Sequence, residues 1–514
     1  MRQRVFNGGN RAIRWLFYAL FLLTVYFALT SPNIILGDNG ILGTSTTMVT
    51  TTFIFVAVIL IIGLWAYRRW YQFYRMIFIQ HQWVTAPLCL GLAVVWQGVL
   101  VACMHPAIGF DVNAIHQALT QPKSTELVGY FSSNPNNLPI LLVQHWLVTI
   151  FHTSSWLFMD MVTTILVDLS VGFNLATVAL WDRHRVPTAM YIHAVWLALF
   201  PMIIVPYTDA WVLPFVSLYL LCYVALTQTT WAWWAKLPVA IIFGGAAVGA
   251  YFMKPSAIVA LIAIVLVEGV FMFKRPLNWR RWASNACLFV VAALTFGGGY
   301  VAGNTALNHQ TFIQINTNRA IPAIHFMSMG VSGDGGYNAK DALKMAELPT
   351  KKARADYSKR KLQERLRKMG VFGYLAFLYQ KQSNNTADGT FAWVKEGHFI
   401  RGNTQPAKTG FAGKLRSFFY LYGTNLCDFR YLAQVWWIIW LLLIALGGRQ
   451  MSKLAQVLRL TIFGGMMFLL LFEGGRSRYL IQFLPAFLLL ATLCANDAIA
   501  LFKHLFGWVN RPVD

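Results

Sequence analysis

The chain contains many apolar runs of about 17–25 residues with few or no charges, the length that an α-helix needs to cross the hydrocarbon of a bilayer. A membrane β-strand would need only about 10 residues of alternating polarity, which excludes a β-barrel. Hydrophobic residues form 57% of the sequence and charged residues only 12%, so lipid is expected to surround most of the chain. The predicted fold class is an all-α polytopic membrane protein.

The runs predict about twelve membrane-spanning helices, within a range of about 11–13. Most of these spans are clear from the sequence, and they are 12–30, 48–66, 84–104, 188–206, 210–227, 237–253, 255–273, 284–303, 432–447, 457–473 and 480–501. A further crossing is expected within 137–181. Its first part, 138–151, is short and carries His145, so we interpret it as a juxtamembrane or re-entrant helix. Only 157–181 is then a full span.

The distribution of Lys and Arg predicts the orientation, because cytoplasmic loops hold an excess of both. Basic residues collect in loops that alternating crossings place on one side, and these are Arg2, Arg4, Arg11, Arg14, Arg68, Arg69, Arg75, Arg183, Arg185, Lys274, Arg275, Arg280 and Arg281. We expect a multi-pass protein of the plasma membrane with both termini in the cytoplasm. The regions 31–47, 105–136 and 304–431 then face outward, together with the short turns 206–209, 253–255 and 473–479.

This topology divides the chain into four parts. Residues 1–83 are expected to form a helical hairpin with cytoplasmic basic ends, and 84–303 a transmembrane core that includes the outer loop 105–136. A large mixed extracellular region, 304–431, precedes the C-terminal transmembrane helices of 432–514.

A basic, helical-looking segment stands out in the expected extracellular region. It contains Lys351, Lys352, Arg354, Lys359, Arg360, Lys361, Arg365, Arg367 and Lys368. Such a run would be attracted to anionic headgroups or to an acidic polymer, or it is simply a solvated helix face. Since this segment and the cytoplasmic loops account for the net charge of +23, nucleic acid is not expected as a partner.

The sequence offers no motif for a cofactor or a metal. The six cysteines lie mostly inside spans and show no zinc spacing, and there is no P-loop, GxSxG or HExxH. Acidic residues inside the spans are costly and call for a role. Asp160 and Asp168 lie near one face of the span 157–181, where they could line an ion path, as in a transporter, or serve as structural carboxylates. Glu268 is interpreted as structural.

The outward-facing residues are more connected chemically. Asp111 is a lone aspartate in a polar and aromatic stretch just past a span, and Lys254, Arg476 and Arg478 fall at predicted outer helix ends. Sugar transfer from a lipid-phosphate donor needs a carboxylate that accepts the acceptor's proton and cations that stabilise the departing phosphate. The alternative for the three cations is that they only anchor helices at the interface.

Further residues are candidate substrate contacts. Tyr130 could stack on a sugar face, and Asn136 and Asn137 could bind hydroxyls or cap the following helix. His325 could touch the donor phosphate or the acceptor, or be a structural histidine. We expect Asp388 to form a turn with Trp393 nearby, and both are candidate substrate contacts.

Several segments together resemble a known family, and they are GFDVNAIHQAL, YFSSNPNNLPILL, YTDAW, MKPSAIVALIAI, AIPAIHFMSMGVSGDGGYNAKD, NTADGTFAWVKEGHF and EGGRSRYLIQFLPAFLLLA. From about residue 84 onward the chain looks like the GT-C superfamily of membrane glycosyltransferases. It is most similar to integral-membrane members of Gram-positive bacteria that are related to the protein mannosyltransferase group.

The resemblance implies a GT-C fold with a catalytic site in the outer loops, a polyprenyl-phosphate sugar as donor, and transfer with inversion. Asp111 matches the family's loop carboxylate that acts as base. Here that carboxylate follows the third span, whereas the superfamily commonly has it after the first. Many relatives also carry a second acid close to the first, for which Asp209 and Glu126 are the candidates.

Three functions therefore stay open. The first is a glycosyltransferase that acts on a cell-envelope acceptor, whether glycan, glycolipid, teichoic acid or protein. The others are a transporter or flippase of lipid-linked sugars and a non-catalytic scaffold with the same fold. The absence of similar halves disfavours a transporter, and the presence of Asp111 with the outer cations disfavours a scaffold. The oligomeric state is open.

Overall fold

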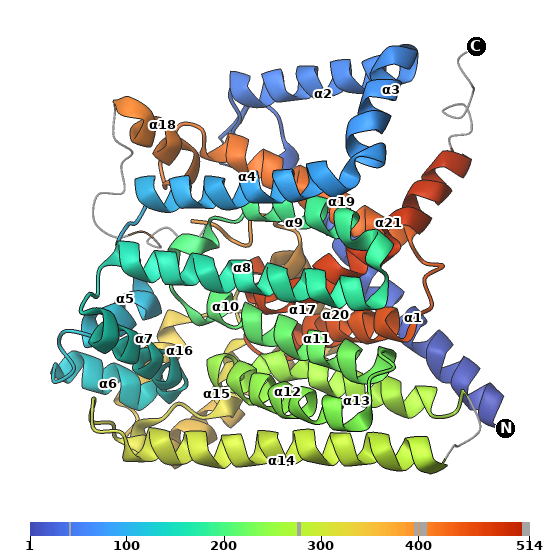
Figure 1. Ribbon diagram of the computed structural model, residues 1–514. Coiled ribbons are helices and arrows are strands. Elements are labelled where there is room, and N and C mark those ends of the chain that lie inside the picture. Colours follow the sequence, from blue (N-terminus) through green and yellow to red (C-terminus); the bar gives the residue numbers. More distant parts are fainter. Residues whose placement is uncertain (41–42, 275–278, 395–399, 401–408, 506–514) are drawn as a thin grey trace.

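The computed structural model describes residues 1–40, 43–274, 279–394, 400 and 409–505, which are mostly α-helical (Figure 1). Two short strands, β1 (Asp38–Asn39) and β2 (Thr44–Ser45), pair in antiparallel register. Arg275, the side chains of Arg280 and Arg281, and residues 395–399 and 401–408 of the expected extracellular region lie outside the described part.

In the described part, ten helices are long and apolar enough to cross a membrane. These spans contain α1 (Arg2–Leu29), α2 (Met48–Ala66), α4 (Gln82–Cys103), α8 (Trp156–Trp181), α11 (Leu213–Gln228), α12 (Trp233–Met253), α14 (Trp279–His309), α19 (Leu426–Leu446), α20 (Lys453–Leu471) and α21 (Leu484–Leu505). The expected all-α polytopic membrane protein is confirmed.

The other helices are shorter or more polar. They are α3 (Arg68–Arg75), α5 (Phe110–Ala118), α6 (Thr125–Ser133), α7 (Leu138–Phe151), α9 (Val186–Ala198), α10 (Thr208–Trp211), α13 (Val259–Phe271), α15 (Ala323–Met329), α16 (Ala339–Glu347), α17 (Lys351–Thr386) and α18 (Gly410–Phe419). Within α17, the basic segment is helical, as its composition predicts.

Two of the expected spans differ from the structure. The run 188–206 is not one helix, because α9 ends at Ala198 and a 3₁₀ segment, η5 (Pro201–Ile204), follows. The proline disfavours helical backbone at the residue before it and supplies no N–H. The run 255–273 consists of a 3₁₀ turn, η6 (Pro255–Ile258), and the short helix α13. The total of about twelve crossings therefore stays a prediction.

The division of 137–181 into two helices is confirmed. Helix α7 has 14 residues and ends at Phe151, and the next residue, His152, has left-handed backbone with φ of 53°. The Ser155 hydroxyl then accepts a hydrogen bond from the Phe158 N–H at 3.2 Å and caps α8, which has 26 residues. The depth of α7 in the membrane is still a prediction.

Helix α21 lies in the core against α19 and α20, and all its side chains from Leu484 to Ala495 are buried. Helix α1 also packs against α19 and α20, with Phe17 and Phe21 fully buried. By contrast, α2 packs mainly on α3 and buries only Thr50 and Gly63. Both helices of the expected hairpin 1–83 contact α19, but α1 is packed into the bundle and α2 is not.

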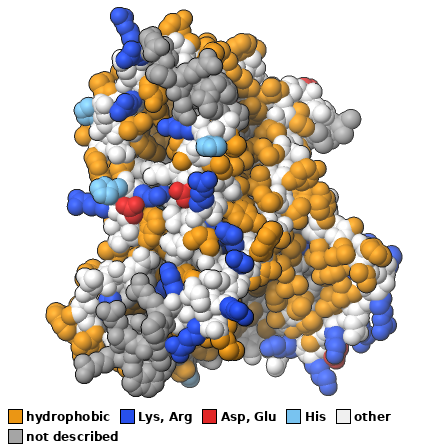
Figure 2. Space-filling model, turned by 90° about the vertical axis from the view of Figure 1, so that its right-hand side faces the viewer, with side chains coloured by type: hydrophobic (Ala, Val, Ile, Leu, Met, Phe, Trp, Pro, Cys, Tyr) orange, Lys and Arg blue, Asp and Glu red, His pale blue; other side chains and the backbone are white. Residues whose placement is uncertain are grey.

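The two ends of the bundle contain different helices, and one of them is rich in basic side chains. The start of α1 and the end of α21 lie at the right-hand end in Figure 1, whereas α5, α6, α7 and α16 gather at the other end. Figure 2 looks at the right-hand end and shows many more Lys and Arg than Asp and Glu side chains there. An excess of basic residues is typical of a cytoplasmic face, as the expected orientation requires.

Candidate functional site

Asp111 lies in the first turn of α5, directly after Phe110. Phe110 has a φ of 55°, in the left-handed region that residues with a side chain rarely adopt. Such backbone costs about 1–3 kcal/mol and persists only where the surrounding structure imposes it. The position of the Asp111 carboxylate is therefore determined by the fold around it.

Two tyrosine hydroxyls hold this carboxylate. Tyr130 of α6 donates to Asp111 Oδ1 at 2.7 Å, and Tyr207, just before α10, donates to Oδ2 at 3.0 Å. Burial raises the pKa of both phenols, and the Asp111 charge raises it further. Both hydroxyls therefore stay protonated and act as donors at neutral pH.

Asn137 fixes the two tyrosines. Its Nδ2 donates to the Tyr130 hydroxyl at 2.6 Å, and its Oδ1 lies 3.3 Å from the Tyr207 hydroxyl. The side chain is 2% exposed and makes no capping bond to α7, although it precedes that helix. The capping role expected for Asn137 is thus not in the structure, its hydroxyl partners are those of the two tyrosines, and contact with substrate hydroxyls stays a prediction.

A pair of cations lies next to this cluster. Asp209 stands two residues after Tyr207 and forms ion pairs with Lys254 and with Arg478, whose Nε is 3.4 Å from Asp209 Oδ2. The Arg478 guanidinium also lies over the Tyr207 ring, 6.0 Å from its centroid. Tyr207 therefore connects the Asp111 carboxylate to the cations.

Glu473 is the third acid of this region. It accepts a hydrogen bond from the Tyr479 hydroxyl at 3.0 Å. Burial raises the pKa of Glu473, while the charges of Arg478 and Arg476 lower it and that of Asp111 raises it. Asp111 and both arginines are therefore among the charges that act on Glu473.

Helix α17 and the loop that follows α15 contact the turn that contains Arg476 and Arg478. Lys381 donates to the carbonyl oxygens of Gly330, Leu470 and Phe472 at 2.7, 3.0 and 2.6 Å. The Gly475 N–H donates to Asn385 Oδ1 at 2.6 Å. These contacts set the backbone of the turn before the two arginines.

The structure thus brings together most of the residues expected at the outer face. The cluster contains Asp111, Tyr130, Asn137, Asp209, Lys254 and Arg478, and Arg476 stands two residues before Arg478. Asn136 reaches it only through a 3.4 Å hydrogen bond to Asn137. Glu126 is exposed on α6. Among the two candidates for the second acid, Asp209 is therefore the one near Asp111, and it is engaged with the cations.

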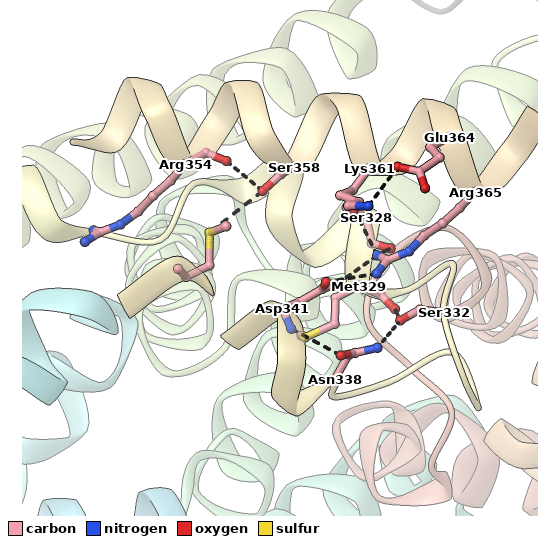
Figure 3. A network of polar contacts seen from close by, with 11 residues as sticks. Ser328, Met329, Ser332, Asn338, Asp341, Arg354, Ser358, Lys361, Glu364 and Arg365 are labelled. Carbon is pink, nitrogen blue, oxygen red and sulfur yellow. Dashed lines mark hydrogen bonds and ion pairs between the residues drawn. The ribbon is translucent and has the colours of Figure 1, made fainter. Parts of the chain in front are cut away.

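His325 lies near a different polar network, that of Asp341 and Arg365, which Figure 3 shows. It is 3% exposed, and burial lowers its pKa. The charges nearest to it are those of Asp341 and Arg365, which form an ion pair at 2.8 Å. Arg365 also donates to the Ser328 carbonyl oxygen at 2.8 Å, which holds α17 against α15 (Figure 3). The structural alternative for His325 fits this setting.

Asp388 begins the expected turn, with Trp393 nearby, and neither residue is among the described contacts of Asp111. Asp388 accepts hydrogen bonds from the Thr390 N–H at 2.9 Å and from Asn33 at 2.9 Å. It lines a polar cavity of about 350 Å³ together with Arg430, and Asp111 is not among the lining residues. Trp393 is fully buried and donates to the Phe419 carbonyl oxygen, so its ring offers no free face.

Residues 5–499 match a family model described as conserved hypothetical integral membrane protein. The chain belongs to this family. No curated protein matches the chain. No solved structure matches it either. The family description states no activity, so the reaction has to be argued from the cluster itself.

Tyr207 and Glu473 are the cluster residues of this integral membrane protein that sequence reasoning did not single out. Both stand in short turns that the topology already placed on the outer face, Pro206 to Asp209 and Glu473 to Tyr479. The shared location of these turns on the predicted outer face is the sequence feature from which Tyr207 and Glu473 could have been identified. In the described part of the chain, no three His, Cys, Asp or Glu side chains group together as a metal site would require.

Proposed function

We propose that this protein is a GT-C-type membrane glycosyltransferase that transfers a sugar from a polyprenyl-phosphate donor to a cell-envelope acceptor outside the plasma membrane. One observation carries the proposal. The Asp111 carboxylate and the Lys254 and Arg478 cations come from separate parts of the sequence, yet Tyr207 and Asp209 join them in one cluster.

The arrangement suits a single displacement at the sugar's anomeric carbon. An acceptor hydroxyl attacks this carbon while Asp111 takes its proton, and the bond between carbon and phosphate oxygen breaks. The lipid phosphate leaves with the electron pair, and Lys254, Arg476 and Arg478 stabilise its charge. Attack opposite the leaving phosphate inverts the anomeric centre. Tyr130 and Tyr207 orient the carboxylate but do not touch the reacting atoms.

Asp209 has a separate task in this scheme. It is 4% exposed and holds Lys254 and Arg478 in place before a donor binds. The donor phosphate would compete with Asp209 for the same cations. Asp209 is thus a positioning residue, and only one carboxylate, Asp111, is needed as base.

The test is transfer of labelled sugar from synthetic polyprenyl-phosphate hexoses to envelope material by the purified protein in nanodiscs. Wild type should transfer one of the hexoses, and Asp111→Asn should reduce turnover by at least about 100-fold, the usual share of a general base. Asp38→Asn, which removes an exposed carboxylate outside the cluster, is the matched control and should keep wild-type turnover. Equal turnover by Asp111→Asn and wild type would overturn the proposal.

A transporter of lipid-linked sugars is the second candidate, and one observation favours it. Asp160 is fully buried in α8, and neither of its carboxylate oxygens has a hydrogen-bond partner among the described residues. An unpaired acid inside a membrane helix is typical of ion-coupled transport. Movement of the labelled donor lipid across a liposome bilayer by wild type but not by Asp160→Asn, without sugar transfer, would place this function first.

A further inference from the structure

Helix α17 is built from two unlike halves that meet at Gly370. The backbone there has φ of 60° and ψ of −174°, which is not helical and suits a residue without a side chain. The half before Gly370 is the basic segment 351–368, and the half after it begins with the apolar residues Val371 and Phe372. The kink lets the two halves point in different directions.

Two arginines of the basic half face inward and are part of the fold. Arg354 is 1% exposed and donates to the carbonyl oxygens of Arg319 and Leu348. Arg365 pairs with Asp341 (Figure 3). Their partners are protein groups, so these two arginines are not available to a ligand.

The other basic side chains of this half lie on the outside. The exposed ones are Lys351, Lys352, Lys359, Arg360, Arg367 and Lys368. They form the pairs 351/352, 359/360 and 367/368, which follow one another at about two helical turns and make up one basic stripe. Asp356 is the acid on this stripe, and Glu364 pairs with Lys361 at 2.8 Å, so the stripe keeps a clear positive excess.

The half after Gly370 exposes an apolar face. Val371, Phe372 and Leu375 have 74%, 87% and 56% of their surface exposed, and Tyr379 continues the face one turn later. The Tyr379 ring packs edge-on against Phe27 of α1, with centroids 4.8 Å apart. The face is therefore next to the last turns of a membrane-spanning helix.

The buried side of the same half also contacts membrane helices. Gln382 donates to the Thr24 hydroxyl of α1 at 3.1 Å and lies against Met466 of α20. On α1, the neighbouring residues Leu22 and Tyr26 are about half exposed in the isolated chain, as lipid-facing side chains would be. The apolar face of α17 is thus continuous with the lipid-facing surface of α1.

From this arrangement we infer that α17 is an interfacial helix: Val371, Phe372 and Leu375 insert into the outer leaflet, and the basic stripe binds the phosphates of anionic phospholipids. An apolar face beside a basic face is the pattern of helices that lie in the membrane interface. Each Lys or Arg close to an anionic surface strengthens binding. Binding of α17 to the membrane does not depend on the reaction, so it can be tested without measuring sugar transfer.

The first test measures the depth of the apolar face. A spin label is attached at Phe372→Cys or at Leu343→Cys, an exposed apolar position on α16, after replacement of the six native cysteines. In nanodiscs of phosphatidylglycerol and phosphatidylcholine, the label at 372 should collide more with oxygen than with a nickel chelate, and the label at 343 the reverse. Nickel access at 372 would overturn the inference. So would protection from both reagents, which would indicate a protein partner.

The second test measures lipid binding by native mass spectrometry. The quadruple variant Lys359→Gln, Arg360→Gln, Arg367→Gln, Lys368→Gln should bind phosphatidylglycerol more weakly by about fivefold for each residue in contact with the surface. The matched control exchanges Lys for Arg and Arg for Lys at the same four positions and should bind as wild type does. Unchanged phosphatidylglycerol binding in the Gln variant, or an equal loss of phosphatidylcholine, would contradict the proposed basic stripe.

Discussion

Tyr207 donates its phenolic hydrogen to Asp111 at 3.0 Å across 96 positions of sequence, and Asp209, two residues further on, holds the cations Lys254 and Arg478. A three-residue turn at the start of α10 thus contacts both halves of the candidate site. The geometry of sugar transfer would depend on this turn as much as on Asp111.

Tyr207→Phe keeps the ring but removes the hydrogen bond to Asp111. A hydrogen bond to a charged group contributes about 1.5–3 kcal/mol, so kcat for sugar transfer should fall about 10- to 100-fold. KM for the donor should change little, because Arg478 stays in place. Steady-state kinetics check both values, with Tyr337→Phe on the exposed surface as control. A variant with wild-type kcat would show that Tyr207 does not position the base.

Asp209→Asn should destabilise the protein. Its carboxylate neutralises two cations in a poorly solvated position, and removal of one partner of a buried ion pair costs about 3–5 kcal/mol. Thermal unfolding in detergent measures the loss. The double variant with Lys254→Met should be less destabilised than the sum of the single changes, since the two groups interact. Additive effects would argue against the ion pair.

Gly475→Ala should destabilise the turn before Arg476. Gly475 has φ of 76°, and an added Cβ would lie 2.5 Å from the Asp334 carbonyl oxygen. Gly37 has a similar φ of 79° but open space around it, so Gly37→Ala carries the backbone strain without the clash. Comparison of the two unfolding temperatures isolates the clash. The prediction requires a larger loss for Gly475→Ala, together with weaker donor use.

Lys381 predicts a pH dependence of stability. Burial lowers its pKa to about 7, although the Glu473 charge opposes this. In the unfolded chain a lysine keeps its proton up to about pH 10.4, so between about pH 7 and 10.4 the unfolded state binds more protons. The contribution of Lys381 to stability should therefore increase with pH in this window and be constant below it.

The Lys381→Met variant tests this pH dependence. The rise in unfolding temperature from about pH 7.5 to about pH 9.5 should be smaller in Lys381→Met than in wild type. Lys344→Met, at an exposed lysine of α16, is the control and should keep the wild-type rise. Identical rises in wild type and Lys381→Met would show that this amine does not titrate in the window.

The helices were predictable from sequence because membrane spans are long and apolar. The break between α7 and α8 was also predictable, since 138–151 is too short to cross. The interruption of 188–206 was overlooked because its apolar composition continues through Pro201, although proline restricts the residue before it. Apolar composition alone therefore did not reveal the restriction that Pro201 places on the backbone.

The candidate site was predictable only in part. Asp111, Lys254 and Arg478 stood out as charges at helix ends. Glu268 pairs with Lys453 at 2.9 Å, an arrangement that fits its interpretation as structural. The roles of Tyr207 and Asn137 depend on which turns meet in space, and spacing along the chain does not determine that. His325 and Trp393 looked equally suitable in sequence, yet their buried contacts became visible only in three dimensions.

The exposure of α2 determines which substitutions this helix can accept during evolution. In the first part of α21, where every side chain from Leu484 to Ala495 is buried, each one must match the shape of its neighbours, so most exchanges would leave a hole or an overlap. Helix α2 buries only Thr50 and Gly63. Fluid lipid chains around this helix would adapt to apolar side chains of any shape. Mutational scanning should therefore find that α2 accepts Leu, Ile, Val and Phe almost interchangeably, whereas α21 tolerates few exchanges.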